Sequence, residues 1–170
     1  MQPNTAAILA VTEIFHDFSQ TQLEMVASIC EPSSQQKGDV VLQEYDTTNA
    51  LYVIGRGSVE IVISPGLVGD SNQQEAEAVV LLELHQGQVT GEVALVDEGT
   101  RSATVRVSED NTYLLKIPRD RLMVLCDNYP ELGYKLMKNL AADLAFKIRN
   151  TDLTVRQLQL MLSQSKKESG

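Results

Sequence analysis

The N-terminal part of the chain has hydrophobic residues at helical spacing. Residues 5–14 are predicted to form a short helix. A second helix is expected after Ser19, an N-cap residue that is followed three positions later by Gln22, as in a capping box. The hydrophobic positions of this second helix are three residues apart: Leu23, Val26 and Ile29. Pro32 and Ser33 are expected to end it.

The pattern changes between Gly38 and Ile117, where hydrophobic residues alternate with polar ones or form short runs separated by glycine. The runs predict strands near residues 40–41, 51–54, 59–63, 79–84, 103–107 and 113–117. A polar connection from Ser64 to about Glu77 separates two of them. A single sheet of this size would expose one apolar face, so the strands favour a sandwich or a closed barrel.

Helical spacing returns after Pro118. Residues 119–126 are predicted to form a short helix, and Pro130 begins a long one that runs to about Ser163 without an internal proline. A seam stripe along the long helix follows the four-three spacing of a coiled coil: Met137, Ala141, Leu144, Ile148, Thr151, Val155, Leu158 and Leu162. A docking stripe near its start covers another face: Leu132, Leu136 and Leu140.

We interpret the seam stripe as a homodimer contact and the docking stripe as the face that packs on the β domain. Thr151, a polar residue within the seam stripe, could set its register. Alternatively, the helix folds back on its own domain, or its tail binds an unknown effector protein. A helix of about 34 residues is roughly 50 Å long, which exceeds the diameter of a small domain. Part of it is therefore expected to project, which favours the dimer.

The chain has 170 residues, a net charge of −9 and 43% hydrophobic residues, which suits one domain with an appended element. The acidic charge disfavours direct binding to nucleic acid or to an anionic membrane. No hydrophobic run approaches the roughly 18 residues that span a bilayer, and none resembles a signal peptide. We therefore expect a cytoplasmic protein.

The few residues that could hold a metal are far apart in the sequence. His16 and His85 lie in different segments without the spacing of a metal site. Cys30 and Cys126 are expected to be free, buried thiols, as is usual in the cytoplasm. A cupin-like metal enzyme would need clustered His and Glu ligands inside the barrel, so we expect no metal, no cofactor and no enzymatic activity.

The segment from Gly87 to Val105 interrupts the strands and carries the candidate chemistry. Residues 91–95 can form a short helical turn, which Gly99 can end in the left-handed conformation. The free N–H groups of such a turn can bind an anion, and Arg101 can supply a planar fork for two phosphate oxygens. Glu92 would repel a phosphate unless it binds a hydroxyl of the same ligand, such as a ribose hydroxyl. A 3′,5′-cyclic nucleotide, with one phosphate charge and a free 2′-hydroxyl, meets these demands.

The motif Gly91-Glu92-x-Ala94-Leu95, followed by Arg101-Ser102-Ala103, resembles the phosphate-binding cassette of cyclic nucleotide-binding domains. The resemblance covers roughly residues 8–160. It includes Phe18-Ser19-x-x-Gln22-Leu23, Lys37-Gly38-Asp39-Val40-Val41, and Leu51-Tyr52-Val53-Ile54 with Gly57-Ser58-Val59. It implies an α+β, mainly β fold: a double-stranded β-helix, or jelly-roll-like β-roll, flanked by N-terminal helices and a long C-terminal helix.

The resemblance also implies roles for individual residues. Arg101 would hold the cyclic phosphate, and Glu92 would accept the ribose 2′-hydroxyl. The remaining phosphate contacts would come from Gly91, Val93, Ala94, Ser102 and Ala103. Pocket walls would include Ile61 and Leu81, and the positions nearest the base on the long helix are Lys147, Ile148 and Thr151. Two departures from the family pattern are Thr90, where the family usually has Phe, and Tyr45, where it often has Gly.

These features predict three parts: a cyclic nucleotide-binding domain with its N-terminal helices (residues 1–130), a dimerisation helix (131–164) and a frayed tail (165–170). Few residues follow the long helix, so we expect a stand-alone sensor of cAMP or cGMP that signals through the dimer helix, without a DNA-binding domain. The alternative is a member of the fold that binds no nucleotide and acts as a dimeric scaffold or senses another small effector. In that case Glu92 and Arg101 would form only a surface ion pair.

Overall fold

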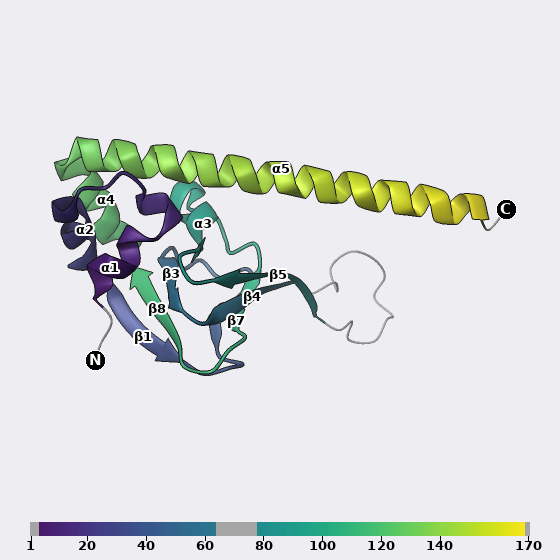
Figure 1. The fold of residues 1–170 in the computed structure, drawn as a ribbon, viewed down its shortest axis with the longest axis horizontal. Helices are drawn as coiled ribbons and strands as arrows, with labels where there is room; N and C mark the ends of the chain where they lie inside the picture. The colour runs from purple at the N-terminus through teal and green to yellow at the C-terminus, as the bar shows by residue number, and fades with distance from the viewer. Residues whose placement is uncertain (1–3, 64–77, 169–170) are drawn as a thin grey trace.

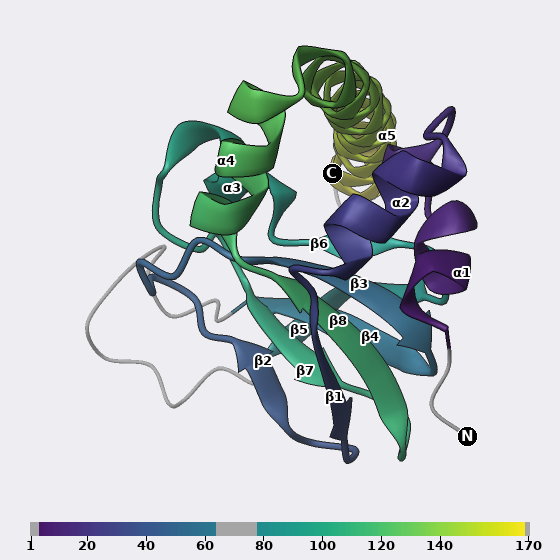
Figure 2. The same cartoon turned by 90° about the vertical axis from the view of Figure 1, so that its left-hand side faces the viewer.

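The computed structural model describes residues 4–63 and 78–168, and it begins with three short helical segments (Figures 1 and 2). These are α1 (Thr5–Ala10), the 3-10 turn η1 (Glu13–Phe15) and α2 (Gln20–Ala27). The predicted capping box is confirmed: the Ser19 side chain accepts from the Gln22 amide at 3.2 Å, and the Gln22 side chain accepts from the Ser19 amide at 2.9 Å.

Two helix boundaries differ from the predictions. Residues 5–14 do not form one helix, because Thr12 is extended and its hydroxyl donates to the Ile8 carbonyl at 2.9 Å, which ends the helical run. The second helix ends at Ala27, and Pro32 and Ser33 lie within a strand rather than terminating a helix. This strand, β1 (Glu31–Gln35), carries no hydrophobic alternation, so the sequence pattern gave no signal for it.

Within the described residues, eight antiparallel strands form two four-stranded sheets, as a β-roll requires (Figure 2). One sheet has the order β1-β8-β3-β6, with β1 (Glu31–Gln35), β8 (Thr112–Ile117), β3 (Leu51–Arg56) and β6 (Val89–Thr90). The other has the order β2-β7-β4-β5, with β2 (Val40–Leu42), β7 (Thr104–Val107), β4 (Ser58–Ile63) and β5 (Val79–His85). The predicted polar connection from Ser64 to Glu77 lies outside the described residues.

The sheet that contains β3 is covered on both faces, which divides the core into two clusters. Val53 belongs to the cluster between this sheet and the helices, whereas Ile54 belongs to the cluster between the two sheets. Successive strand residues point to opposite faces, so both neighbours are fully buried. This explains why residues 51–54 form a continuous hydrophobic run.

Two helices close the chain: α4 (Arg119–Asn128) and α5 (Pro130–Glu168). The docking stripe of α5 is buried, and it packs in the cluster that contains the N-terminal helices and one face of the β3 sheet. Asn139 fixes this contact by donating to the carbonyls of Ile14 and His16 at 3.1 and 2.8 Å. The expectation that this stripe docks on the domain is therefore confirmed.

The rest of α5 projects beyond the β-roll (Figure 1). With 39 residues the helix is about 58 Å long. The predicted end near Ser163 is too early, and the expected frayed tail is helical as far as Glu168, because Gln, Lys and Glu favour helix and no Gly or Pro interrupts them. Residues 169–170 lie outside the described part.

The remaining sequence expectations for the fold concern membranes and cysteines. Within the described residues, no helix has the length and apolar character that crossing a membrane requires. Cys30 and Cys126 are free and only partly buried. Burial raises the pKa of the Cys30 thiol to about 12, so this sulfur stays protonated at neutral pH.

Candidate functional site

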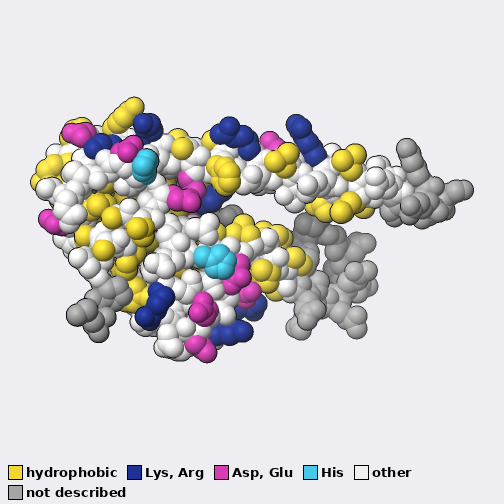
Figure 3. Space-filling model, viewed as in Figure 1, with side chains coloured by type: hydrophobic (Ala, Val, Ile, Leu, Met, Phe, Trp, Pro, Cys, Tyr) yellow, Lys and Arg dark blue, Asp and Glu magenta, His cyan; other side chains and the backbone are white. Residues whose placement is uncertain are grey.

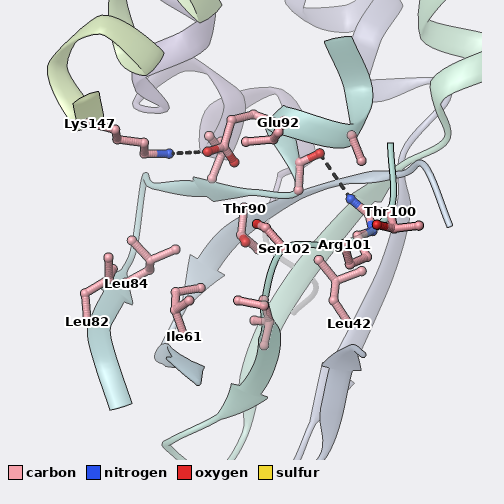
Figure 4. Close-up of a pocket in the computed structure, with 16 residues that line it drawn as sticks. Leu42, Ile61, Leu82, Leu84, Thr90, Glu92, Thr100, Arg101, Ser102 and Lys147 are labelled. Atoms are coloured by element: carbon pink, nitrogen blue, oxygen red, sulfur yellow. Dashed lines mark hydrogen bonds and ion pairs between the residues drawn. The ribbon is translucent and has the colours of Figure 1, made fainter. Parts of the chain in front are cut away.

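A pocket of about 150 Å³ opens between the β-roll, the short helix α3 (Glu92–Asp97) and α5 (Figure 4). The helix α3 is inserted between β6 and β7, as the segment from Gly87 to Val105 predicted. The lining combines apolar side chains of the roll with a few polar ones: Leu42, Ile61, Leu82, Leu84, Val89, Thr90, Gly91, Glu92, Val93, Ala94, Thr100, Arg101, Ser102, Ala103, Val105 and Lys147.

Gly91 makes the entry into α3 possible. Its φ of 86° is in the left-handed region, which costs glycine little. A Cβ at this position would lie 2.8 Å from the Ala50 carbonyl oxygen and 2.8 Å from the Arg101 guanidinium. Any larger residue would therefore push the Arg101 side chain out of place, in addition to the backbone strain.

Arg101 is buried within the roll and only 3% exposed. Its guanidinium donates to the Thr48 hydroxyl at 3.1 Å, the Gly91 carbonyl at 3.2 Å and the Ala50 carbonyl at 2.8 Å. A guanidinium has five N–H groups, so two of them have no partner among the described residues. Burial lowers the Arg101 pKa, an effect that nearby Tyr52, Glu92 and Asp46 oppose, but an arginine stays charged in this setting.

The loop before β3 holds the Arg101 backbone in place. The Arg101 carbonyl accepts from the Tyr45 amide at 2.9 Å, and the Arg101 amide donates to the Asp46 carbonyl at 2.8 Å. Tyr45 has a φ of 71°, in the left-handed region that favours glycine. This backbone conformation accounts for the glycine that the family often has where this chain has Tyr45.

Glu92 lies at the other end of the pocket and is 7% exposed. Its Oε1 atom is 2.8 Å from the Nζ atom of Lys147, which reaches the pocket from α5 (Figure 4). Nζ is also 2.9 Å from a carboxylate oxygen of Asp143, one turn earlier on α5. Glu92 Oε2 has no hydrogen-bond partner within the described part of the chain, so it remains available as an acceptor.

The charge of Lys147 is stabilised by these two carboxylates. Partial burial acts to lower its pKa, but the charges and hydrogen bonds of Glu92 and Asp143 outweigh burial and raise the pKa above the ordinary lysine value. The cation thus stays protonated at neutral pH and connects α5 to the first residue of α3.

The structure brings most of the predicted site residues together in this pocket. Gly91, Glu92, Val93, Ala94, Arg101, Ser102 and Ala103 all line it, together with Ile61 and Lys147. Glu92 and Arg101 are both buried with separate partners, so they do not form the surface ion pair of the scaffold alternative.

Three predicted positions lie outside the pocket. Leu81 is 54% exposed, because Ile61 pairs with Leu82 across β4 and β5 and side chains alternate along a strand. The wall is therefore formed by Leu82 and Leu84, not by Leu81. Ile148 and Thr151 of α5 are also exposed and do not line the pocket, so of the three candidate base contacts only Lys147 lies in it.

Two residues that sequence reasoning missed help to fix α3. The end of α3 is in the left-handed conformation at Glu98, one residue before the predicted Gly99. Arg119 of α4 forms an ion pair with Glu98 and donates to the Leu95 carbonyl at 3.0 Å. The sequence offered no signal for this contact, because Arg119 and Glu98 are distant in the chain.

Comparisons with known proteins agree with this architecture. The family model for the cyclic nucleotide-binding domain matches residues 33–129. The cyclic AMP receptor protein of Thermus thermophilus is 29% identical over 140 residues, which are 82% of this chain and 59% of that protein. The regulatory subunit of cAMP-dependent protein kinase from Dictyostelium discoideum is 32% identical over 101 residues, 59% of this chain and 29% of that protein.

Solved structures share the fold. The catabolite activator protein of Thermus thermophilus superposes with a TM-score of 0.71 at 28% identity, over 87% of this chain and 63% of that one. A cyclic nucleotide-binding domain from Methylobacillus flagellatus gives 0.72 at 24% identity, over 86% of this chain and 77% of that one. The chain thus spans 59% of the length of its Thermus relative. Because the family model covers more than half of the chain, the protein belongs to the cyclic nucleotide-binding domain family.

Proposed function

We propose that the protein is a non-enzymatic sensor that binds a 3′,5′-cyclic nucleotide in the pocket beside α3. One observation carries the proposal: two buried charged groups of opposite sign, Arg101 and Glu92, line the same pocket, and each keeps unused hydrogen-bonding capacity. A ligand that presents an anion and a hydroxyl at a fixed distance would use both. Cyclic phosphate and ribose 2′-hydroxyl are such a pair.

The phosphate is proposed to bind between Arg101 and the start of α3. The two unpartnered N–H groups of Arg101 can donate to two phosphate oxygens, with the geometry that makes such pairs strong. The first-turn amides of α3 have no acceptor within the helix and can donate to the same anion. Ser102 and Ala103, which line the same region, complete the proposed shell.

The ribose is proposed to bind at Glu92, where Oε2 accepts the 2′-hydroxyl while Oε1 keeps Lys147. The base would then extend toward α5. The cavity of about 150 Å³ is smaller than the roughly 300 Å³ of ordinary ligand pockets. It holds the phosphate and ribose more readily than the whole nucleotide, so the base would meet Lys147 and the apolar side chains of β5.

We take cAMP as the first ligand to test, because two of the relatives are named for cAMP. cGMP is the second. Residues 1–130 would then form the sensing domain and residues 131–164 the output helix of a cytoplasmic regulator. Because the Lys147–Glu92 pair joins the pocket to α5, ligand binding would change the preferred position of the helix, a population shift between two placements.

The output helix is proposed to pair with a second copy through the seam stripe. Met137, Ile148, Val155, Leu158 and Leu162 are between 39% and 65% exposed, a row of large apolar side chains that a coiled coil would cover. Sedimentation equilibrium of the wild type and of Val155→Glu tests this contact. We expect a dimer and a monomer, respectively, and a monomeric wild type would contradict it.

One observation favours the scaffold alternative. Glu92 is already paired with Lys147, so the acceptor proposed for the ribose is partly satisfied by the protein itself. In a scaffold this pair would simply lock α5 onto the roll. The titration described next separates the two functions.

Calorimetric titration of cAMP and cGMP tests the proposed site. Arg101→Leu should weaken binding by about 10–150-fold, from the roughly 1.5–3 kcal/mol of a hydrogen bond to a charged group. Arg106→Leu is the matched control, because Arg106 pairs with Glu60 outside the pocket. It should leave affinity unchanged. If neither nucleotide binds the wild type, as measured by heat and by thermal shift, the proposal is wrong and the scaffold alternative is favoured.

A further inference from the structure

A third row of apolar side chains runs along α5, apart from the seam and docking stripes. Phe146, Leu153 and Leu160 are spaced seven residues apart and are 62%, 57% and 62% exposed. We call them the outer stripe. At about 100° per residue, Leu153 lies about 160° around the axis from Val155 of the seam stripe. A two-stranded dimer through the seam stripe would therefore leave the outer stripe in solvent.

Cations flank the outer stripe on one side. Lys138, Arg149 and Arg156 are exposed, and in helical projection they lie between the outer stripe and the seam stripe. None of the three forms an ion pair with another described residue. Figure 3 shows dark blue side chains interspersed with yellow ones along the exposed part of α5, with a magenta side chain between them. In the sequence, Asp152 lies between Arg149 and Arg156. This arrangement is notable in a chain of net charge −9.

The outer stripe leads into a groove near the N-terminal helices. The groove has a volume of about 610 Å³ and lies between residues 10–16 and α5. Val11, which is 63% exposed, and Phe146 both line it. A helical partner lying along the outer stripe would therefore have a groove for one of its ends, in which Val11 and Phe146 are accompanied by the polar residues Glu13, His16, Asn139 and Asp143.

We infer that the outer stripe and its flanking cations bind an amphipathic helix of another protein, one whose own flank carries Asp or Glu. Apolar side chains that are seven residues apart lie about two turns apart on one line along the helix. This line can pack along the apolar face of a second helix. Charge complementarity to Arg149 and Arg156 requires carboxylates beside the partner's apolar face. This surface lies outside the nucleotide pocket and does not depend on the proposed function.

Other occupants fit the charges less well. An antiparallel second copy on this face would bring the two cationic flanks together, which is repulsive, and a parallel copy would place Arg149 and Arg156 beside the uncharged flank of Asn150 and Gln157. Nucleic acid would leave the apolar row without a partner. An anionic membrane would gain roughly 1 kcal/mol from each cation near its surface, but the net charge of −9 opposes its approach.

The test uses a fluorescent peptide of about three heptads with Leu at a and d and Glu at e and g, and a twin with Lys at e and g. Like charges at e and g keep each peptide from pairing with itself. Binding to the full chain is followed by fluorescence anisotropy. We expect the acidic peptide to bind and the basic twin not to bind. Arg149→Glu combined with Arg156→Glu should weaken binding by roughly 10-fold or more.

The matched pair Leu153→Glu and Val155→Glu distinguishes the two stripes, since both residues are exposed on the same part of α5. Loss of peptide binding in Leu153→Glu with retention in Val155→Glu supports the inference. The reverse result, equal binding of the basic twin, or no binding of the acidic peptide overturns it. Sedimentation with phosphatidylserine vesicles is run in parallel, and binding to vesicles without binding to the peptide also overturns it.

Discussion

The two ends of the pocket are built in different ways. Arg101 is held entirely by the β-roll and its loops, through Thr48, Ala50 and Gly91. Glu92 depends on α5, because its ion-pair partner is Lys147. The Arg101 end is thus complete within the domain, whereas the Glu92 end is completed by a helix that mostly lies outside it. A ligand that contacts both ends would therefore couple the position of α5 to a site that is fixed within the β-roll.

The strongest test of this difference is Arg101→Lys, which keeps the charge but loses the fork. A lysine cannot reach both carbonyls and the Thr48 hydroxyl, so buried acceptors lose their donors. We expect the free energy of unfolding to fall by about 2–3 kcal/mol in urea denaturation. In Arg106→Lys, where the partner Glu60 lies on β4 outside the pocket, the fall should be below about 1 kcal/mol. Equal losses in both variants would contradict the view that Arg101 organises the roll.

Glu92→Gln tests the end of the pocket that is completed by α5. The amide cannot balance the Lys147 charge, although Asp143 still can, so we expect a loss of about 1–2 kcal/mol in the free energy of unfolding. Hydrogen exchange should speed up in α5 around residues 143–150 and remain unchanged in β3. Glu131→Gln, which breaks the exposed pair with Lys135, is the control with little effect. Unchanged exchange in α5 would show that the pair does not hold the helix.

A double-mutant cycle measures the interaction between Glu92 and Lys147 itself. Lys147→Met keeps the methylene packing and removes the charge, and it is combined with Glu92→Gln. We expect a coupling energy of about 1 kcal/mol between the two sites, as for interacting neighbours. The same cycle between Arg101→Lys and Lys147→Met should give a coupling close to zero, because these residues share no hydrogen-bond partner and the lysine keeps the charge that acts on Glu92. A large coupling in the second cycle would mean that the two ends of the pocket are not independent.

The smallest effect is a pH dependence at the alkaline side. The folded-state pKa of Lys147 is raised above the ordinary value of 10.5. The stability from its ion pairs is therefore fully present below pH 10.5 and is lost as the pH rises through the folded-state pKa. Urea denaturation between about pH 10 and 12 should show a steeper fall for the wild type than for Lys147→Met. Parallel curves would argue that the pair contributes nothing to stability.

Much of the architecture could be predicted from local patterns. The capping box at Ser19 and Gln22 and the spacing of the docking stripe depend on neighbouring residues, and the structure confirms both. Strand β1 was missed because Glu31–Gln35 has no hydrophobic alternation, and its pairing with β8 supplies what its own residues do not. Leu81 was misplaced because a continuous apolar run does not show which residues face inward.

In the candidate site, too, residues in a contiguous motif could be predicted and residues from distant segments could not. Arg101 and Glu92 were identifiable because their motif is contiguous in sequence. Thr48, Asp143 and Arg119 were not, because each meets the site from a separate segment of the chain. Lys147 was noted only as a possible base contact, and its pairing with Glu92 required knowledge of the angle at which α5 crosses the roll.

The length of α5 makes it a lever with its fulcrum near the pocket. The domain clamps its first turns through Asn139 and the docking stripe, and Lys147 is the last residue of the helix that lines the pocket. About 30 Å of helix follow Lys147. A tilt of about 10° at this point would displace the far end by roughly 5 Å, which is about the rise of one helical turn. A small rearrangement at Glu92 would thus be enlarged into a sideways displacement of several ångströms at the far end of α5.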